Sequence, residues 1–179
     1  MDGVVDGDNG ADWWARDSIA ERLDNMTVQG GVPGPWSERL PHFRIDATPS
    51  NGDEIQTEYL VALEDAVAAL RAVRELAVSI APALLISELR TVAADDLWLS
   101  TAGGRDSLCI HFTWRNLPAE VAALVPRIEA TLASFDARPH WGKVNTVDAA
   151  TFESLYPRLP DFRALVARRD PHGSSATPI

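Results

Sequence analysis

Hydrophobic and polar residues alternate in two segments of the chain, 54–62 and 107–115, as they do along a β-strand with one buried face. In 107–115 the hydrophobic set occupies every second position and consists of Leu108, Ile110, Phe112 and Trp114. In 54–62 one face carries Ile55, Thr57, Tyr59 and Val61, and the other carries Gln56, Glu58 and Leu60. Residues 83–92 are rich in branched apolar side chains and predict another strand, central in the sheet.

Two longer segments have helical spacing instead. In 64–82 hydrophobic residues recur every three or four positions until Pro82 ends the pattern, and 117–135 repeats it, with a kink or a new start expected at Pro126. Residues 137–144 predict a last extended segment, followed by two short helices at 148–156 and 161–169. Ahead of the first strand, glycine and proline in 30–36 predict a turn, and 42–46 predicts a short strand.

The elements therefore follow one another as strand, helix, strand, strand, helix, strand. This order predicts an α+β fold: a ferredoxin-like βαββαβ two-layer sandwich, with two helices on one face of an antiparallel sheet and short helices at the C-terminal end. Residues 1–24 are acidic and glycine-rich and are expected to be a poorly ordered lead-in. The folded domain is expected at 25–171, and a short tail at 172–179.

Strand parity predicts which side chains lie on the sheet face that the helices leave uncovered. The polar members of that set are Gln56 and Glu58, Glu88 and Arg90, and His111 and Thr113. The apolar residues expected to accompany Glu88 and Arg90 are Leu84, Ile86 and Val92. Two interpretations stay open at this point. The face is either the solvated side of an antiparallel sheet or a small polyol or sugar site, where polar groups converge on an apolar surface.

Composition and charge exclude several classes of function. The net charge is −10 and the pI is near 4.7, whereas nucleic acids and anionic membranes attract basic proteins. No apolar run reaches the ~18 residues of a membrane span, and the acidic start is unlike a secretory signal, so we expect a cytoplasmic protein. Cys109 is the only cysteine, which excludes an internal disulfide, and no ligand cluster predicts a metal site.

Several segments resemble one enzyme family. They are GVPGPWSERLPHFR (31–44), ISELRTVAADDLWLS (86–100), IHFTW (110–114), RPHWGK (138–143) and YPRLPDF (156–162). Together they resemble the C-terminal region of the bacterial alditol (xylitol) oxidases, which are FAD-dependent flavoproteins related to the D-arabinono-1,4-lactone oxidases of the vanillyl-alcohol oxidase family. The resemblance covers about residues 25–171. It implies a cap domain that shapes a substrate pocket over a flavin held by another domain.

The resemblance also implies roles for individual residues. Glu88 and Arg90 correspond to the polyol-binding glutamate and arginine, and Lys143 to the active-site lysine. The pocket histidine and threonine correspond to His111 and Thr113, a further pocket position to Gln56, and His140 to a residue that packs near the flavin or in the core. Arg90 and Lys143 are the expected catalytic residues, because fixed cations favour the negative charge that grows on the substrate oxygen. Whether Lys143 acts as a cation or as a base stays open.

The chain has neither the covalent-FAD histidine motif nor a glycine-rich phosphate loop, so we expect a substrate-binding domain that lacks its flavin domain. Three interpretations follow. The chain is part of an oxidase completed by a separate flavin-domain chain, an inactive truncated remnant, or a stand-alone module that binds a sugar-like ligand or dimerises. Without a partner domain, the uncovered face is expected to promote self-association.

Overall fold

The computed structural model describes residue 27 and residues 33–35, 38–39 and 53–173. The chain divides into two compact units, Met1–Gly52 and Asp53–Ile179, and the sheet with its helices belongs to the second unit. The predicted lead-in at 1–24 and the predicted strand at 42–46 lie outside the described residues. In the described ranges, no helix has the combination of length and apolar character that crossing a membrane requires.

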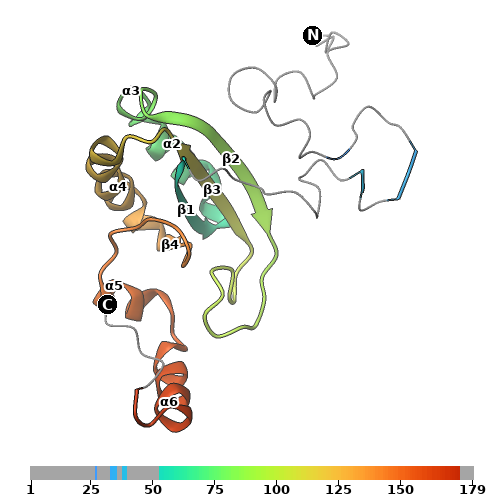
Figure 1. Ribbon diagram of the computed structural model, residues 1–179, viewed down its shortest axis with the longest axis vertical. Helices are drawn as coiled ribbons and strands as arrows, with labels where there is room; N and C mark the ends of the chain where they lie inside the picture. The colour runs from blue at the N-terminus through green and yellow to red at the C-terminus, as the bar shows by residue number, and fades with distance from the viewer. Residues whose placement is uncertain (1–26, 28–32, 36–37, 40–52, 174–179) are drawn as a thin grey trace. The chain divides into compact units, whose positions relative to one another are not determined.

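The second unit is an α+β two-layer sandwich, as predicted (Figure 1). Its sheet has the order β2-β3-β1-β4 and antiparallel pairing throughout. The strands are β1 (Ile55–Ala62), β2 (Leu84–Val92), β3 (Ser107–Trp114) and β4 (Arg138–Pro139). The helices are η3 (Leu63–Asp65), α2 (Ala66–Arg74), α3 (Ala77–Ile80), α4 (Pro118–Leu132), η4 (Ala133–Phe135), α5 (Ala149–Leu155) and α6 (Leu159–Arg169).

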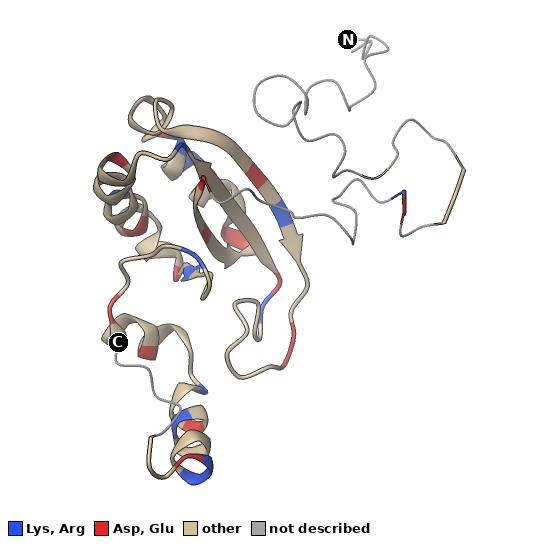
Figure 2. Ribbon diagram, in the orientation of Figure 1, with Lys and Arg blue, Asp and Glu red and all other residues tan. Residues whose placement is uncertain are grey.

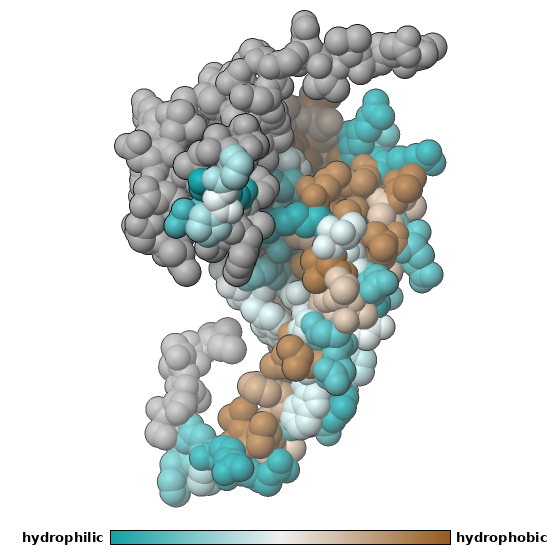
Figure 3. All heavy atoms as spheres, turned by 90° about the vertical axis from the view of Figure 1, so that its right-hand side faces the viewer, coloured by the Kyte–Doolittle hydropathy of each residue, from teal (hydrophilic) through white to brown (hydrophobic). Residues whose placement is uncertain are grey.

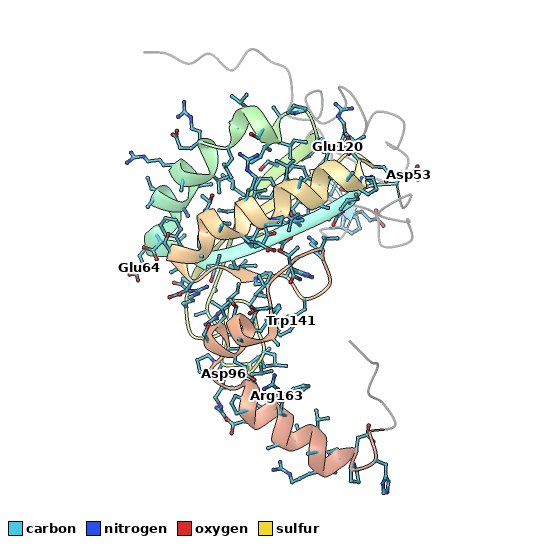
Figure 4. All side chains as sticks on the ribbon, turned by 90° about the vertical axis from the view of Figure 1, so that its left-hand side faces the viewer. Asp53, Glu64, Asp96, Glu120, Trp141 and Arg163 are labelled. Atoms are coloured by element: carbon cyan, nitrogen blue, oxygen red, sulfur yellow. The ribbon has the colours of Figure 1, made fainter. Side chains whose placement is uncertain are left out.

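Helices α2 and α4 cover one face of the sheet, and Figure 4 shows α4 in front of β1. The core between the layers takes the alternate residues that parity assigned to that face. They are Tyr59, Val61, Leu108, Ile110, Phe112 and Trp114, packed on Ala69 and Val73 of α2 and on Val121, Leu124, Val125 and Ile128 of α4. The indole Nε1–H of Trp114 donates to Thr57 Oγ1 at 3.0 Å, which satisfies both buried polar groups.

Several predicted elements differ in detail from the structure. The segment 83–92 forms β2, which lies at an edge of the sheet and not at its centre, because within the described residues it pairs only with β3. The segment 64–82 is not one helix, because backbone N–H groups of Glu75 and Leu76 bond three residues back and separate α2 from α3. Helix α4 runs without interruption through Pro126, which lies on its exposed side. The segment 137–144 pairs as a strand only at Arg138–Pro139 before it turns.

A β-bulge in β2 corrects the predicted place of Leu84. The register shifts between Leu84 and Ile86, so that Leu84 lies opposite Trp114 and packs against the helix-covered core. Leu84 therefore does not share a face with Glu88 and Arg90, because the extra residue of a bulge reverses the alternation on one side of it. Ile86 and Val92 keep the predicted face, opposite Thr113 and Ser107.

The loop between β2 and β3 folds over part of the uncovered face. Ala102 from this loop packs on Leu60 and Cys109 in a small second core. The guanidinium of Arg138 holds the loop in place, since it donates to the carbonyl oxygens of Thr101, Gly103 and Leu155. The loop and the C-terminal end of α5 are thereby joined to β4.

Candidate functional site

Strand register brings polar side chains from β1, β2 and β3 into one row on the uncovered face. Glu58 lies opposite His111, which in turn lies opposite Glu88. The next row on one side contains Gln56, Thr113 and Ile86, and the next row on the other contains Leu60, Cys109 and Arg90. Neighbouring acidic and basic bands on β2 are visible in Figure 2. The side chains therefore lie on the face that strand parity predicted.

The turn after β4 adds Lys143 to this group. Backbone N–H groups of His140 and Val144 donate to the carbonyl oxygens of Glu58 and Gln56, so both ends of the turn are held against β1. A further backbone bond from Lys143 N–H to His140 O closes the turn. The side chain of Lys143 consequently points back over the strand and reaches the carboxylate of Glu58.

The centre of the cluster is Oε2 of Glu58. It accepts from Lys143 Nζ in a short contact, lies 2.8 Å from His111 Nδ1 and accepts from Arg90 Nη2 at 3.4 Å. Arg90 also donates to Glu88 Oε2 at 3.1 Å. Arg90 therefore contacts both carboxylates, and Lys143 is connected to Arg90 and Glu88 through Glu58. Sequence reasoning placed Glu58 on this face without recognising it as a site residue.

Burial divides the cluster into an inner and an outer layer. The side chains of His111 and Glu58 are 5% and 9% exposed, and that of Lys143 is 17% exposed. Those of Glu88 and Arg90 are 36% and 52% exposed. The outer pair, Glu88 and Arg90, is therefore open to a ligand. The inner carboxylate of Glu58 holds the side chains of Arg90 and Lys143 in place.

Glu58 is an ionised carboxylate in this setting. Burial is the largest influence and raises the pKa of Glu58, but hydrogen bonds from His111, Lys143 and Cys109, together with the charge of Lys143, hold that pKa well below its usual range. Burial and the neighbouring carboxylate raise the pKa of the Cys109 thiol to about 12. Cys109 is thus a protonated, buried strand residue without the thiolate that a nucleophile needs.

The remaining predicted site residues lie at different places. Thr113 is half-buried and its Oγ1 is 3.0 Å from His111 Nε2, so it extends the cluster towards one edge. Gln56 shares the row of Thr113, and within the described part of the chain its side chain has no hydrogen bond. His140 lies apart from the cluster, and its Nδ1 accepts from the backbone N–H of Gly142.

His140 lines a shallow hollow of about 430 Å³. The other lining residues are Leu97, Leu99, Ser100, Thr101 and Trp141. Trp141, labelled in Figure 4, stacks on Phe152 of α5 and donates from Nε1 to the carbonyl of Leu99. The side of the molecule on which β2 lies shows hydrophobic and hydrophilic residues next to each other (Figure 3).

Among the described residues, no His, Cys, Asp and Glu side chains gather in a group of three or more that could hold a metal ion.

Comparison with known proteins gives this arrangement a family context. The sequence model of the D-arabinono-1,4-lactone oxidase family matches residues 47–177. The chain is 51% identical over 150 residues to an alditol oxidase of a Streptomyces species, a match that covers 84% of this chain and 36% of that protein. It is 30% identical over 155 residues to an L-gulono-1,4-lactone dehydrogenase of Mycobacterium tuberculosis, covering 86% and 36%.

A shorter match, 37% identical over 93 residues, is to a long-chain alcohol oxidase from an uncultured marine euryarchaeote. It covers 48% of this chain and 19% of that protein. The chain thus spans about a third of the length of the first two relatives, with 36% of each covered.

Proposed function

The chain belongs to the D-arabinono-1,4-lactone oxidase family, and on that premise we propose that residues 53–173 form the substrate-binding part of an FAD-dependent oxidase of alditols or aldonolactones. One observation carries the proposal: Glu88, Arg90, Lys143, His111 and Thr113 converge from three separate elements around Glu58, on the sheet face without helices. Such a constellation offers several fixed donors and acceptors to one small ligand.

The charges of the cluster favour a neutral ligand with many hydroxyl groups. Two carboxylates, Glu58 and Glu88, are paired with two cations, Arg90 and Lys143. With His111 neutral, the formal charge of the cluster is zero. A sugar phosphate would add negative charge that no free cation of the cluster balances. A polyol or lactone is uncharged and can form hydrogen bonds with these side chains without adding charge.

Each residue has a distinct part in the proposed site. Glu88 accepts hydrogen bonds from substrate hydroxyls, and Arg90 and Lys143 lie where negative charge on the reacting oxygen is stabilised. Thr113 contacts a further hydroxyl, with His111 behind it. The flavin, when bound, accepts the hydride that the substrate carbon loses.

The described residues fit only the ring portion of FAD. The hollow beside His140 and Trp141 is mainly apolar, which suits a flat aromatic ring. A diphosphate needs free cations or grouped backbone N–H groups, and the cations of the cluster are already bound to Glu58 and Glu88. We therefore propose that a flavin domain outside residues 53–173, on the same or a separate chain, holds the phosphates.

Ligand binding tests the proposal directly. We expect xylitol to shift backbone NMR signals of Thr113, Glu88 and Lys143 in the ¹⁵N-labelled chain, and 1,5-pentanediol, which has the same carbon count but no internal hydroxyls, to shift them much less. Glu88→Gln should weaken xylitol binding about fivefold or more, since it replaces a charge-assisted acceptor with a neutral one. The matched control is Glu64→Gln at an exposed position of η3, which should bind as the wild type does. Equal binding of both alcohols would contradict the proposal.

Catalysis requires a second experiment. The chain is mixed with FAD, xylitol and the isolated flavin domain of a related alditol oxidase, and hydrogen peroxide is measured. Peroxide that depends on both proteins supports an oxidase completed by a partner chain. Its absence, with both proteins folded and xylitol bound, would favour a polyol-binding module without oxidase activity.

A further inference from the structure

Strand β2 is an edge of the sheet with one open side. Among the described residues it pairs with β3, no strand lies on its other side, and Figure 1 shows it along the outside of the sheet. Its register with β3 is regular from Ile86 to Val92, because the bulge lies before this stretch. All residues of the stretch except Ile86 and Glu88 are exposed. A regular edge of this length presents backbone N–H and C=O groups to which another strand can bind.

The features that normally keep edge strands apart are few in β2. The stretch 86–92 contains neither proline nor lysine, and Leu89 at its middle is 53% exposed. Its charged side chains are Glu88 and Arg90, which are bonded to each other at 3.1 Å. These two charges disfavour any strand that brings a like charge opposite either of them, since directly opposed like charges destabilise a sheet.

A second copy of the same strand matches both charges. In an antiparallel pair centred on Leu89, Glu88 of each copy lies opposite Arg90 of the other, so two pairs of opposite charge form. The remaining opposed pairs join similar side chains: Leu89 with Leu89, Ser87 with Thr91, and Ile86 with Val92. The sequence ISELRTV is thus complementary to itself when one copy is reversed.

Other registers lose this match. A shift by two residues places Glu88 opposite Glu88 or Arg90 opposite Arg90. A shift by one residue would bring side chains of opposite sheet faces into register, which an antiparallel pair does not allow without turning one strand over. The register centred on Leu89 also places the helices of both copies on the same face of the joined sheet.

We propose that two copies of the chain associate through β2, edge to edge and antiparallel about Leu89, so that two four-stranded sheets join into one of eight strands. The seam is short, and the dimer is therefore reversible and depends on concentration. It places Arg90 of the second copy beside Glu88, so the outer layers of two candidate sites adjoin. The contact does not depend on the proposed function, since it involves no ligand.

Sedimentation velocity of the full chain from micromolar to millimolar concentration measures the association. We expect the mass to rise from 19.5 kDa towards twice that value. A mass of 19.5 kDa at every concentration would overturn the proposal.

Exchanging charges tests the register. Glu88→Arg or Arg90→Glu alone places like charges opposite each other and should weaken the dimer about tenfold. An equimolar mixture of the two variants restores opposite charges at both positions and should associate as the wild type does. Each substitution changes the net charge of −10 by two, so both variants stay negative and net charge cannot draw them together. A mixture as weak as its components, with both folded by circular dichroism, would contradict the register.

A substitution at the centre of the seam keeps the test valid if Arg90→Glu does not fold. Leu89→Lys changes an exposed side chain, places two ammonium groups opposite each other and should reduce association at least about tenfold. The matched control is Val78→Lys on α3, where the side chain is 89% exposed, and it should associate as the wild type does. Association that Leu89→Lys leaves unchanged would overturn the proposal and place the contact elsewhere, such as on the uncovered sheet face.

Discussion

Replacing Lys143 with methionine should lower the stability of the fold, because the lysine is the closest cation to the nearly buried carboxylate of Glu58. Methionine has a similar length and fills the same space without charge. The side chain of Glu58 is 9% exposed, and that of Lys143 is 17% exposed. Removing one partner of a buried ion pair costs about 3–5 kcal/mol, most of it from the charge left behind.

Two other contacts of Glu58 make the expected loss of stability smaller than about 3–5 kcal/mol. Arg90 still donates to Glu58 Oε2, although at 3.4 Å and from a side chain that is 52% exposed. His111 Nδ1 also lies 2.8 Å from the same oxygen and stays there when Lys143 is replaced. We therefore expect the free energy of unfolding to fall by about 2–3 kcal/mol at pH 7. Urea unfolding followed by tryptophan fluorescence measures this difference.

Acid should reduce the difference between wild type and variant. The folded-state pKa of Glu58 is depressed below its ordinary value of 4.5, so the stability it contributes is present above that pH and is lost as the pH falls towards the folded pKa. Lys143→Met has less of this stability to lose, and the two unfolding free energies should approach each other between about pH 4.5 and pH 3.

The control is Arg71→Met, which removes an exposed cation from α2 and should change stability by no more than about 0.5 kcal/mol at either pH. A loss for Lys143→Met as small as that of the control would refute the ion-pair reasoning. A large loss that stays constant from pH 7 to about pH 3 would show that packing, and not charge, is responsible.

Three further predictions follow from contacts outside the ion pair. Thr57→Val leaves the buried indole N–H of Trp114 without an acceptor and should cost about 1–3 kcal/mol in urea unfolding, whereas Thr57→Ser should cost less than half of that. Arg138→Met removes three donations to backbone carbonyls and should raise amide hydrogen exchange in the loop 93–106 before the sheet is affected. Cys109, with its thiol pKa raised to about 12 and its side chain buried, should react with a disulfide reagent at pH 8 many times more slowly in the native chain than in urea, and equal rates would contradict its placement.

Much of the fold follows from local periodicity. The alternation in β1 and β3 assigned Tyr59 and Ile110 to the core and Glu58 and His111 to the other face, because side chains of a strand point to opposite sides at every residue. That relation needs no knowledge of the partner strand. The helical spacing of 64–82 and 117–135 likewise indicated which layer would cover the sheet, although not the break after α2.

Local periodicity could not predict how the strands pair with one another. The bulge that moves Leu84 to the core depends on how β2 and β3 align, and no alternation within β2 indicates it. The opposition of Glu58 and His111 is likewise a matter of register. This explains why Glu58 was placed on the correct face and still not recognised as the centre of the cluster.

Lys143 is a second residue whose position local periodicity could not predict. Family resemblance pointed to it, but periodicity could not, since it lies in a turn. Its position over Glu58 arises because the backbone bonds of His140 and Val144 attach the turn to β1 at both ends. The sequence by itself determined the layers and the face on which the polar residues of the strands lie, because those depend on spacing between near neighbours. Only the tertiary structure decided which of these residues touch, because contacts between distant segments depend on strand register and on the backbone hydrogen bonds that anchor the turn.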